Sequence, residues 1–424
     1  MLIVHKLNLP LVLFLFTASL FTGSTPSSGQ AQAETDLSAA AYRNIRSLPS
    51  DHDYFNIRGT ADNSLTRFNR GGECRVAFLG GSITHNPGWR EMVGSFLEGR
   101  FPEAEFDFIN AGIPSMGSTP GAFRIKRDVL SRGPVDLLFV EAAVNDSTNG
   151  RSDREQVRAM EGILRQARCA NPAVDVMFLY FADPQKTAAY NKGDIPAVIR
   201  NHEKVAEYYQ VSSLNLALEV AERISARQFS WKEDFKDLHP SPFGQHLYGK
   251  SIKRMLQALW ANPDKTASTI TDHGMPADPL DPESYVNGRL IAVSHADNVR
   301  GWKFTDNWKP GDSASTREGF VNVPALEGLQ PGDKIQLKFT GKAVGIFVAS
   351  GPDAGMVEFS VDGKPSKTLD LFTRWSSRLH LPWAHVLETG LAASEPHCLE
   401  LEVSAKRNPE STGNAVRVFH FLAN

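Results

Sequence analysis

The sequence contains very little cysteine and no cluster of basic residues. Its three cysteines, Cys74, Cys169 and Cys398, allow one disulfide at most, which excludes a disulfide-stabilised scaffold. The formal net charge is −3, and lysine and arginine are spread along the chain, so the charge pattern of a nucleic-acid-binding protein is missing. Beyond residue 33, no apolar run is long enough to cross a membrane.

The motifs of common cofactor and metal sites are also missing. The glycine-rich stretch GGSITHNP contains no GxxxxGK[ST], and no GxGxxG opens the helix pattern that follows it. His380 and His385 have no companion of the HExxH kind. We therefore expect no nucleotide, no other cofactor and no metal ion.

The first 33 residues have the pattern of a secretory signal peptide. Lys6 precedes an almost entirely apolar run from Leu9 to Leu20, and AQA at 31–33 fits a small-x-small cleavage site. We expect cleavage after Ala33, which makes the mature protein secreted or periplasmic.

Residues 71–262 alternate short apolar runs with helix patterns. Strands are predicted at 75–79, 105–109, 135–140, 174–180 and 211–216, and several are continuously apolar, as in strands covered on both faces. Apolar residues spaced three and four apart predict helices around 89–97, 157–167, 198–209 and 243–260. This alternation predicts an α/β domain with a doubly wound, mostly parallel sheet.

The composition changes after this first domain. Residues 263–284 are rich in proline, aspartate and threonine without periodicity, which predicts a linker. Residues 285–424 alternate apolar and polar residues in KIQLKFTG, AVGIFVAS, MVEFSVDGKPS, CLELEVSA and AVRVFHFL, with turns such as VDGK at 361–364. This pattern predicts an antiparallel β-sandwich. Residues 34–70 are interpreted as an extended lead-in.

A serine follows the first predicted strand, in the stretch VAFLGGSITHNPGW at 76–89. Taken alone, GGS fits an ordinary turn, a phosphate-binding loop or a nucleophile at the edge of a sheet. Three more polar loops follow: NAGIPSMGS at 110–118, VEAAVND at 140–146 and KDLHPSPFGQHLYG at 236–249. Ligands of open parallel sheets bind at the carboxyl ends of the strands, so we expect these four loops to converge at one edge.

In this order, the four loops resemble the sequence blocks of the SGNH hydrolases, also called GDSL-type esterases. The resemblance covers roughly residues 75–255 and implies a flavodoxin-like fold. It implies that Ser82 is the nucleophile and His239 the general base that takes its proton. The implied oxyanion hole combines the Ser82 amide, a second-loop amide at Ser115 or Gly117, and the Asn145 side chain.

The chain departs from the family pattern at the acid. The family places its acid three residues before the histidine, where this sequence has Lys236. Asp237 lies two residues before His239 and Asp234 five before it, and we favour Asp237 over the alternative acid Asp234. A Ser–His dyad, in which a backbone carbonyl orients the imidazole, is the third possibility.

Other polar and aromatic residues near these loops have simpler interpretations. Glu141 is expected to be a buried partner near the site, for example of Arg124, and Asp146 is expected to hold its loop. Trp375 and Trp383 fit stacking on sugar rings, but aromatic residues in a β-core are commoner.

Together these patterns predict a secreted serine esterase that removes acyl groups, chiefly acetyl, from a carbohydrate or polysaccharide. An SGNH domain followed by a β-sandwich is similar to the arrangement in several carbohydrate esterases. One alternative is an acyltransferase or lipase-like hydrolase that uses the same site. Another is a carbohydrate-binding or structural surface protein with a degenerate esterase domain. Lys236 at the position of the family's acid is the feature that supports this second alternative.

Overall fold

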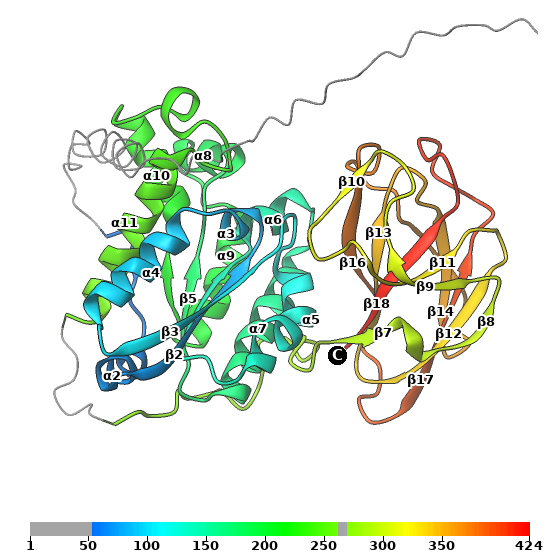
Figure 1. Ribbon diagram of the computed structural model, residues 1–424, viewed down its shortest axis with the longest axis horizontal. Coiled ribbons are helices and arrows are strands. Elements are labelled where there is room, and N and C mark those ends of the chain that lie inside the picture. The colour runs from blue at the N-terminus through cyan, green and yellow to red at the C-terminus, as the bar shows by residue number, and fades with distance from the viewer. Residues whose placement is uncertain (1–52, 262–268) are drawn as a thin grey trace, which may run out of the picture. The chain divides into compact units, whose positions relative to one another are not determined.

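The computed structural model describes residues 53–261 and 269–424 (Figure 1). The predicted signal peptide at 1–33, residues 34–52 of the lead-in and residues 263–268 of the linker lie outside the described residues. No helix in the described ranges is long and apolar enough to cross a membrane.

A six-stranded sheet forms the centre of the first domain, in the order β1-β6-β5-β4-β2-β3. Every pair is parallel except β1 with β6. The strands are β1 (Phe55–Asn56), β2 (Gly72–Gly80), β3 (Ala104–Gly112), β4 (Leu137–Glu141), β5 (Asp175–Leu179) and β6 (Ser212–Leu214). The five predicted strands correspond to β2–β6, and all residues of β4 and β5 are buried. The predicted α/β class with a mostly parallel sheet is confirmed.

Helices cover both faces of this sheet (Figure 1). On one face α4 packs against α11, and on the other α7 packs against α5 and α9. The helices are α2 (Asp62–Arg70), α3 (Ser82–His85), α4 (Trp89–Arg100), α5 (Ser118–Asp128), α6 (Ala143–Thr148), α7 (Asp153–Ala170), α8 (Pro184–Asn191), α9 (Ala197–Tyr208), α10 (Leu216–Ser225) and α11 (Pro242–Leu259), with short turns η1 (Leu130–Arg132) and η2 (Trp231–Phe235). Residues 62–70, predicted as part of an extended lead-in, instead form α2.

The order of the five parallel strands places the topological switch point beside β2. From β2 the chain moves outward to β3 and then returns to β4 on the other side of β2. Connections at such a point leave opposite faces of the sheet and open a crevice at the carboxyl ends of the strands. The loops after β2 and β4 border this crevice, and they carry Ser82 and Asn145.

Two mostly antiparallel sheets form the second domain. One has the order β10-β16-β13-β18-β11-β9, with β7 also paired to β18, and the other has the order β15-β14-β17-β12-β8. The strands are β7 (Arg289–Ala292), β8 (Ala296–Arg300), β9 (Lys303–Trp308), β10 (Ser315–Thr316), β11 (Val323–Gly328), β12 (Lys334–Thr340), β13 (Val344–Ser350), β14 (Met356–Val361), β15 (Lys367–Asp370), β16 (Leu379–Glu388), β17 (Pro396–Val403) and β18 (Val416–Ala423), with the turn η3 (Val293–His295). Apolar residues of both sheets share one core, which confirms the predicted sandwich.

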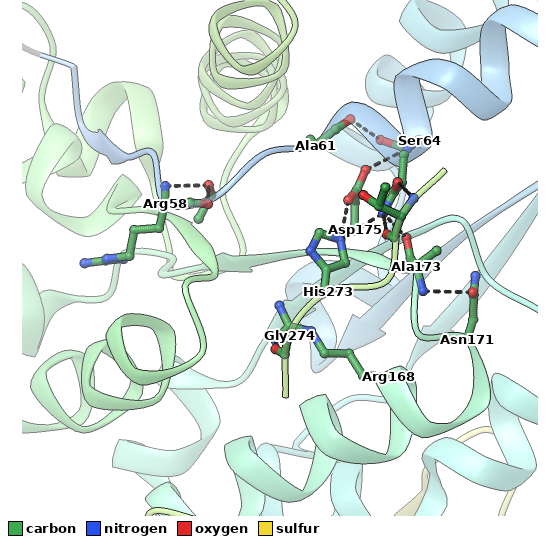
Figure 2. A network of polar contacts seen from close by, with 12 residues as sticks. Arg58, Ala61, Ser64, Arg168, Asn171, Ala173, Asp175, His273 and Gly274 are labelled. Atoms are coloured by element: carbon green, nitrogen blue, oxygen red, sulfur yellow. Dashed lines mark hydrogen bonds and ion pairs between the residues drawn. The ribbon is translucent and has the colours of Figure 1, made fainter. Parts of the chain in front are cut away.

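A polar network attaches helix α2 and the irregular segment around His273 to the amino end of the parallel sheet (Figure 2). Asp175, the first residue of β5, accepts a hydrogen bond from the Ser64 N–H at 2.7 Å and contacts His273 Nε2 at 2.8 Å. Arg168 donates to the Gly274 carbonyl at 3.1 Å. This network lies at the opposite end of the strands from Ser82, so it holds the fold together without entering the candidate site.

Candidate active site

Ser82 is the first residue of α3, directly after the glycine pair that ends β2. Its side chain is partly exposed, while Ile83 and Thr84 behind it are buried. The Ser82 Oγ lies 2.7 Å from His239 Nε2, which is hydrogen-bonding distance. These two residues are 157 positions apart in the sequence.

His239 lies in the exposed loop between η2 and α11, and the start of α11 holds this loop in place. Ser241 caps the helix by accepting from the Gly244 N–H, and Pro242 occupies the first turn. The Ser241 N–H also donates to the Phe235 carbonyl at 3.0 Å. The loop that carries His239 is therefore held at its start by the bond to Phe235 and at its end by the cap of α11.

The two predicted acids make other hydrogen bonds. The Asp237 Oδ1 accepts from the Leu238 N–H at 2.5 Å, and the Asp234 Oδ2 accepts from the Ser230 N–H at 2.7 Å. Among the described residues, the one hydrogen bond of the His239 ring is the bond to Ser82. The choice between Asp237, Asp234 and a dyad therefore stays a prediction.

Gly81 is the point at which three of the four loops meet. A Cβ atom placed on Gly81 would lie 1.9 Å from Asn145 Oδ1 and 3.2 Å from the Met116 carbonyl oxygen. Only glycine fits there, because real Cβ atoms do not approach other atoms so closely. The Asn145 side chain and the second loop thus lie directly against the turn that carries Ser82.

Several N–H donors near this turn have no acceptor in the described part of the chain. They are the backbone N–H groups of Ser82, Ser115 and Gly117 and the side-chain amide nitrogen of Asn145. Donors without an internal acceptor can bind a developing oxyanion.

Ser115 and Gly117 differ in what surrounds them. The Ser115 Oγ accepts a hydrogen bond from Arg317 at 2.8 Å, and its backbone has a φ of 71°. A Cβ on Gly117 would lie 2.1 Å from Asp146 Oδ1, so this position requires glycine. This steric requirement favours Gly117 as the position at which the family pattern has glycine.

Asp146 holds the second loop from beneath. Its carboxylate accepts from the Ser118 N–H at 2.8 Å and from the Ser118 Oγ at 2.6 Å, and it contacts His202 Nε2 at 3.0 Å. All three side chains are fully buried. The sequence suggested that Asp146 holds its own loop, whereas its carboxylate binds Ser118 of the second loop and contacts His202. The only sequence signal for His202 was its place in the pattern of α9.

Glu141, the last residue of β4, lies beneath the Ser82 turn. Its Oε1 accepts from the Gly81 N–H at 2.5 Å and from the Thr84 Oγ at 2.9 Å. Burial raises the pKa of Glu141 to about 7, although these two hydrogen bonds oppose the shift. The sequence placed Glu141 near the site but did not predict contact with the Ser82 turn.

The second domain contains the remaining candidates. Trp375 is exposed, whereas Trp383 is partly buried with the Arg151 guanidinium 5.2 Å from its ring centre. His380 contacts Asp312, and burial lowers the pKa of His385 to about 3. Residues 53–261 and 269–424 contain no group of three metal-ligating side chains.

Comparison with known proteins gives one family match, over the first domain. Residues 78–247 match the model of the GDSL-like Lipase/Acylhydrolase family, and this interval includes Ser82, Asn145 and His239. No curated protein matches the sequence.

Solved structures match over one or both domains. The chain is similar to a two-domain esterase (CEX) active on acetylated mannans, co-crystallised with mannopentaose, with 20% identity and a TM-score of 0.69. That match covers 87% of this chain and 96% of the other. An acetylxylan esterase from Geobacillus stearothermophilus matches with 17% identity and a TM-score of 0.34, covering 44% of this chain and 95% of that chain.

Proposed function

Through residues 78–247 this ester hydrolase belongs to the GDSL-like lipase/acylhydrolase family, and we propose that it is a secreted serine esterase that deacetylates a carbohydrate. The observation that carries the proposal is the 2.7 Å contact between Ser82 Oγ and His239 Nε2 at the carboxyl edge of the sheet. Unpaired N–H donors lie beside this contact, so nucleophile, base and oxyanion hole are all available at one place.

The proposed reaction has two steps. The Ser82 Oγ attacks the acetyl carbonyl carbon while His239 Nε2 takes the hydroxyl proton, so the other ring nitrogen carries the imidazole N–H. The carbonyl oxygen becomes an oxyanion that accepts hydrogen bonds from the Ser82 N–H, the Gly117 N–H and the Asn145 amide. When the bond between carbonyl carbon and sugar oxygen breaks, the imidazolium returns its proton to the sugar oxygen. Water then attacks the acetyl-serine through the same base and releases acetate.

Two observations support a carbohydrate as the substrate. The fold likeness to the esterase active on acetylated mannans extends over both domains, and not only over the hydrolase domain. The site is also open, because His239 is exposed and the loops at 110–118 and 140–146 carry few large apolar side chains. A polar, exposed site suits a hydrated polymer better than a lipid.

Secretion is part of the proposal and rests on the N-terminal sequence pattern. A charged start, an apolar run and AQA at 31–33 together are typical of an exported precursor. An exported esterase would meet extracellular polysaccharides.

The direct test is the Ser82→Ala variant. We expect wild-type protein to release acetate from acetylated mannan, acetylated xylan and an aryl acetate, and the variant to lose at least about 10⁴-fold in kcat. Acetate release and labelling by a fluorophosphonate probe are the measurements, with the thermal unfolding midpoint as the control for folding.

The alternatives give different results in the same experiment. A degenerate domain in a binding protein would leave wild-type Ser82 unlabelled and all esters intact. A lipase-like enzyme would prefer long-chain esters to acetylated glycans. Retained turnover in Ser82→Ala would show that another residue is the nucleophile.

A further inference from the structure

We propose that Arg124 and Glu141 are positioning residues that hold the peptide group between Gly80 and Gly81, and with it the Ser82 hydroxyl and N–H, in reactive geometry. This inference rests on the proposed role of Ser82 as nucleophile. Neither side chain forms a hydrogen bond with Ser82. Both would act through the Gly80–Gly81 peptide group, which is separated from Ser82 by the Gly81 Cα atom.

The two side chains bind opposite ends of one peptide group. Glu141 Oε1 accepts from the Gly81 N–H at 2.5 Å, and Arg124 Nη2 donates to the Gly80 carbonyl oxygen at 3.1 Å. This carbonyl and this N–H belong to the same peptide bond. Because a peptide group is planar, two bonds at its opposite ends determine the orientation of the whole unit.

Burial makes this arrangement strong. Arg124 is 0% exposed and Glu141 is 3% exposed, so water does not screen either charge. A negative charge at the N–H end and a positive charge at the carbonyl end both stabilise the peptide dipole. Arg124 also forms an ion pair with Asp128 at 2.9 Å, so its own charge is compensated on α5 independently of Glu141.

Other atoms pack closely around this peptide group. A Cβ on Gly80 would lie 2.4 Å from both Glu141 Oε1 and Thr84 Oγ. The Gly80 carbonyl also accepts from the Ile113 N–H at 3.0 Å, which belongs to the loop that follows β3. The same peptide group therefore connects the nucleophile turn with the loop that offers oxyanion donors.

The protonation state of Glu141 should affect this arrangement. Burial raises its pKa to about 7, so the carboxylate form is lost as the pH falls below neutrality. A neutral carboxylic acid is a weaker acceptor for the Gly81 N–H than a carboxylate. The charged and titratable groups that face Glu141 are Arg124 on α5, Asp146 on α6, Lys186 on α8 and Tyr248 on α11.

The first test is Glu141→Gln, which keeps the shape and one acceptor oxygen but removes the charge. We expect kcat for an aryl acetate to fall about 10–100-fold, since small misplacement of a reacting group has effects of this size. We expect KM to stay within about twofold, because the side chain does not line the substrate site. At acidic pH, the part of the fall in wild-type kcat that comes from protonation of Glu141 should be missing in the variant.

Thr84→Val is the second variant. It tests the same inference if Glu141→Gln yields too little folded protein for kinetics. It removes one hydrogen bond to Glu141 Oε1 and leaves the Gly81 bond in place. Since the Thr84 hydrogen bond lowers the pKa of Glu141, its loss should shift the acidic limb of the kcat profile to higher pH. A purely structural role of Glu141 would not move this limb.

Glu161→Gln is the matched control, because Glu161 is also a fully buried glutamate but lies on α7 and binds residues 280–284 instead of the Ser82 turn. It should lower thermal stability without changing kcat or its pH profile. Wild-type kcat and pH dependence in both Glu141→Gln and Thr84→Val would overturn this inference while the esterase assignment stands. Failure of the wild-type protein to hydrolyse any ester would overturn the proposed function instead.

Discussion

The reactivity expected of Ser82 comes from the groups around it. A serine hydroxyl is a weak nucleophile until a base takes its proton, and His239 lies at the distance this transfer requires. The glycines before Ser82 let Asn145 and Glu141 approach the turn from two sides. The acid of a Ser–His–Asp triad is the one member without an assigned residue. Lys236 occupies the position at which the family pattern has this acid.

We predict that Asp237→Asn lowers kcat by at least about 10-fold, whereas Asp234→Asn changes it little. Asp234 uses its Oδ2 to close the turn at Ser230, whereas Asp237 lies on the exposed loop next to His239. The measurement is kcat of each variant on an aryl acetate. Both variants carry the same Asp→Asn change and differ only in the residue number at which it is made. Equal, wild-type activity in both would favour the Ser–His dyad, and a larger loss in Asp234→Asn would reverse the assignment.

Among the helices, α5 (Ser118–Asp128) begins directly after the second loop of the site. The sequence did not predict α5, because Pro120 and Gly121 disfavour a helix in most contexts. In the structure both lie in its first turns, where proline is tolerated, and Gly121 lets the helix approach Ile163 on α7. Close packing, rather than local propensity, forms this helix.

The network in Figure 2 gives a test of how β5 stabilises α2 and the irregular segment around His273. Asp175→Ala removes the acceptor of the buried Ser64 N–H and the partner of His273. A buried donor left without an acceptor costs about 1–3 kcal/mol, so we expect the free energy of unfolding to fall by this amount.

Denaturant unfolding measures this change, and the exposed residue Asp272 supplies the control variant Asp272→Ala, which should leave stability unchanged. Because Asp175 lies at the amino end of the strands, KM for an ester should not respond. A change in KM with unaltered stability would contradict the assigned role.

The connection between the two domains is a packed part of the molecule. Residues 269–288 contain no helix or strand, and they bind to the hydrolase domain at several points. Tyr285 is buried and donates its N–H to the Arg158 carbonyl, and its ring packs against Phe123. Asn424, the last residue, donates to the Ser284 carbonyl and so joins the end of the sandwich to this segment.

Glu161 on α7 is the anchor of this connection. Its carboxylate accepts from the N–H groups of Leu280 and Asp281 and from the hydroxyls of Ser284 and Tyr209. In glutamine an NH₂ group replaces one of the two carboxylate oxygens. The N–H or O–H groups that donate to that oxygen in the wild type would then have no acceptor. We therefore expect Glu161→Gln to lower the free energy of unfolding by about 1–3 kcal/mol.

Denaturant unfolding again measures the effect, with Glu98→Gln on the exposed side of α4 as the control. If Glu161→Gln were as stable as the wild type, the segment would be an ordinary flexible linker, as its composition alone suggests.

The sequence alone determined the elements whose signal is local. The continuously apolar runs at 137–140 and 176–179 predicted interior strands, and the alternating pattern at 334–340 predicted a sandwich strand. Burial of a strand on both faces selects apolar residues throughout, whereas burial on one face selects them at every second position. The order of the polar loops, through its resemblance to the SGNH hydrolase blocks, also indicated Ser82, Asn145 and His239.

Only the tertiary structure decided which polar groups meet. Nothing local links Glu141 to Gly81, Asp146 to His202 or Glu161 to Ser284, since these partners are 56 to 123 residues apart. A buried polar side chain needs a hydrogen-bonding partner. Which partner lies within reach depends on how the folded chain brings distant segments together, and the local pattern of residue types does not contain this information.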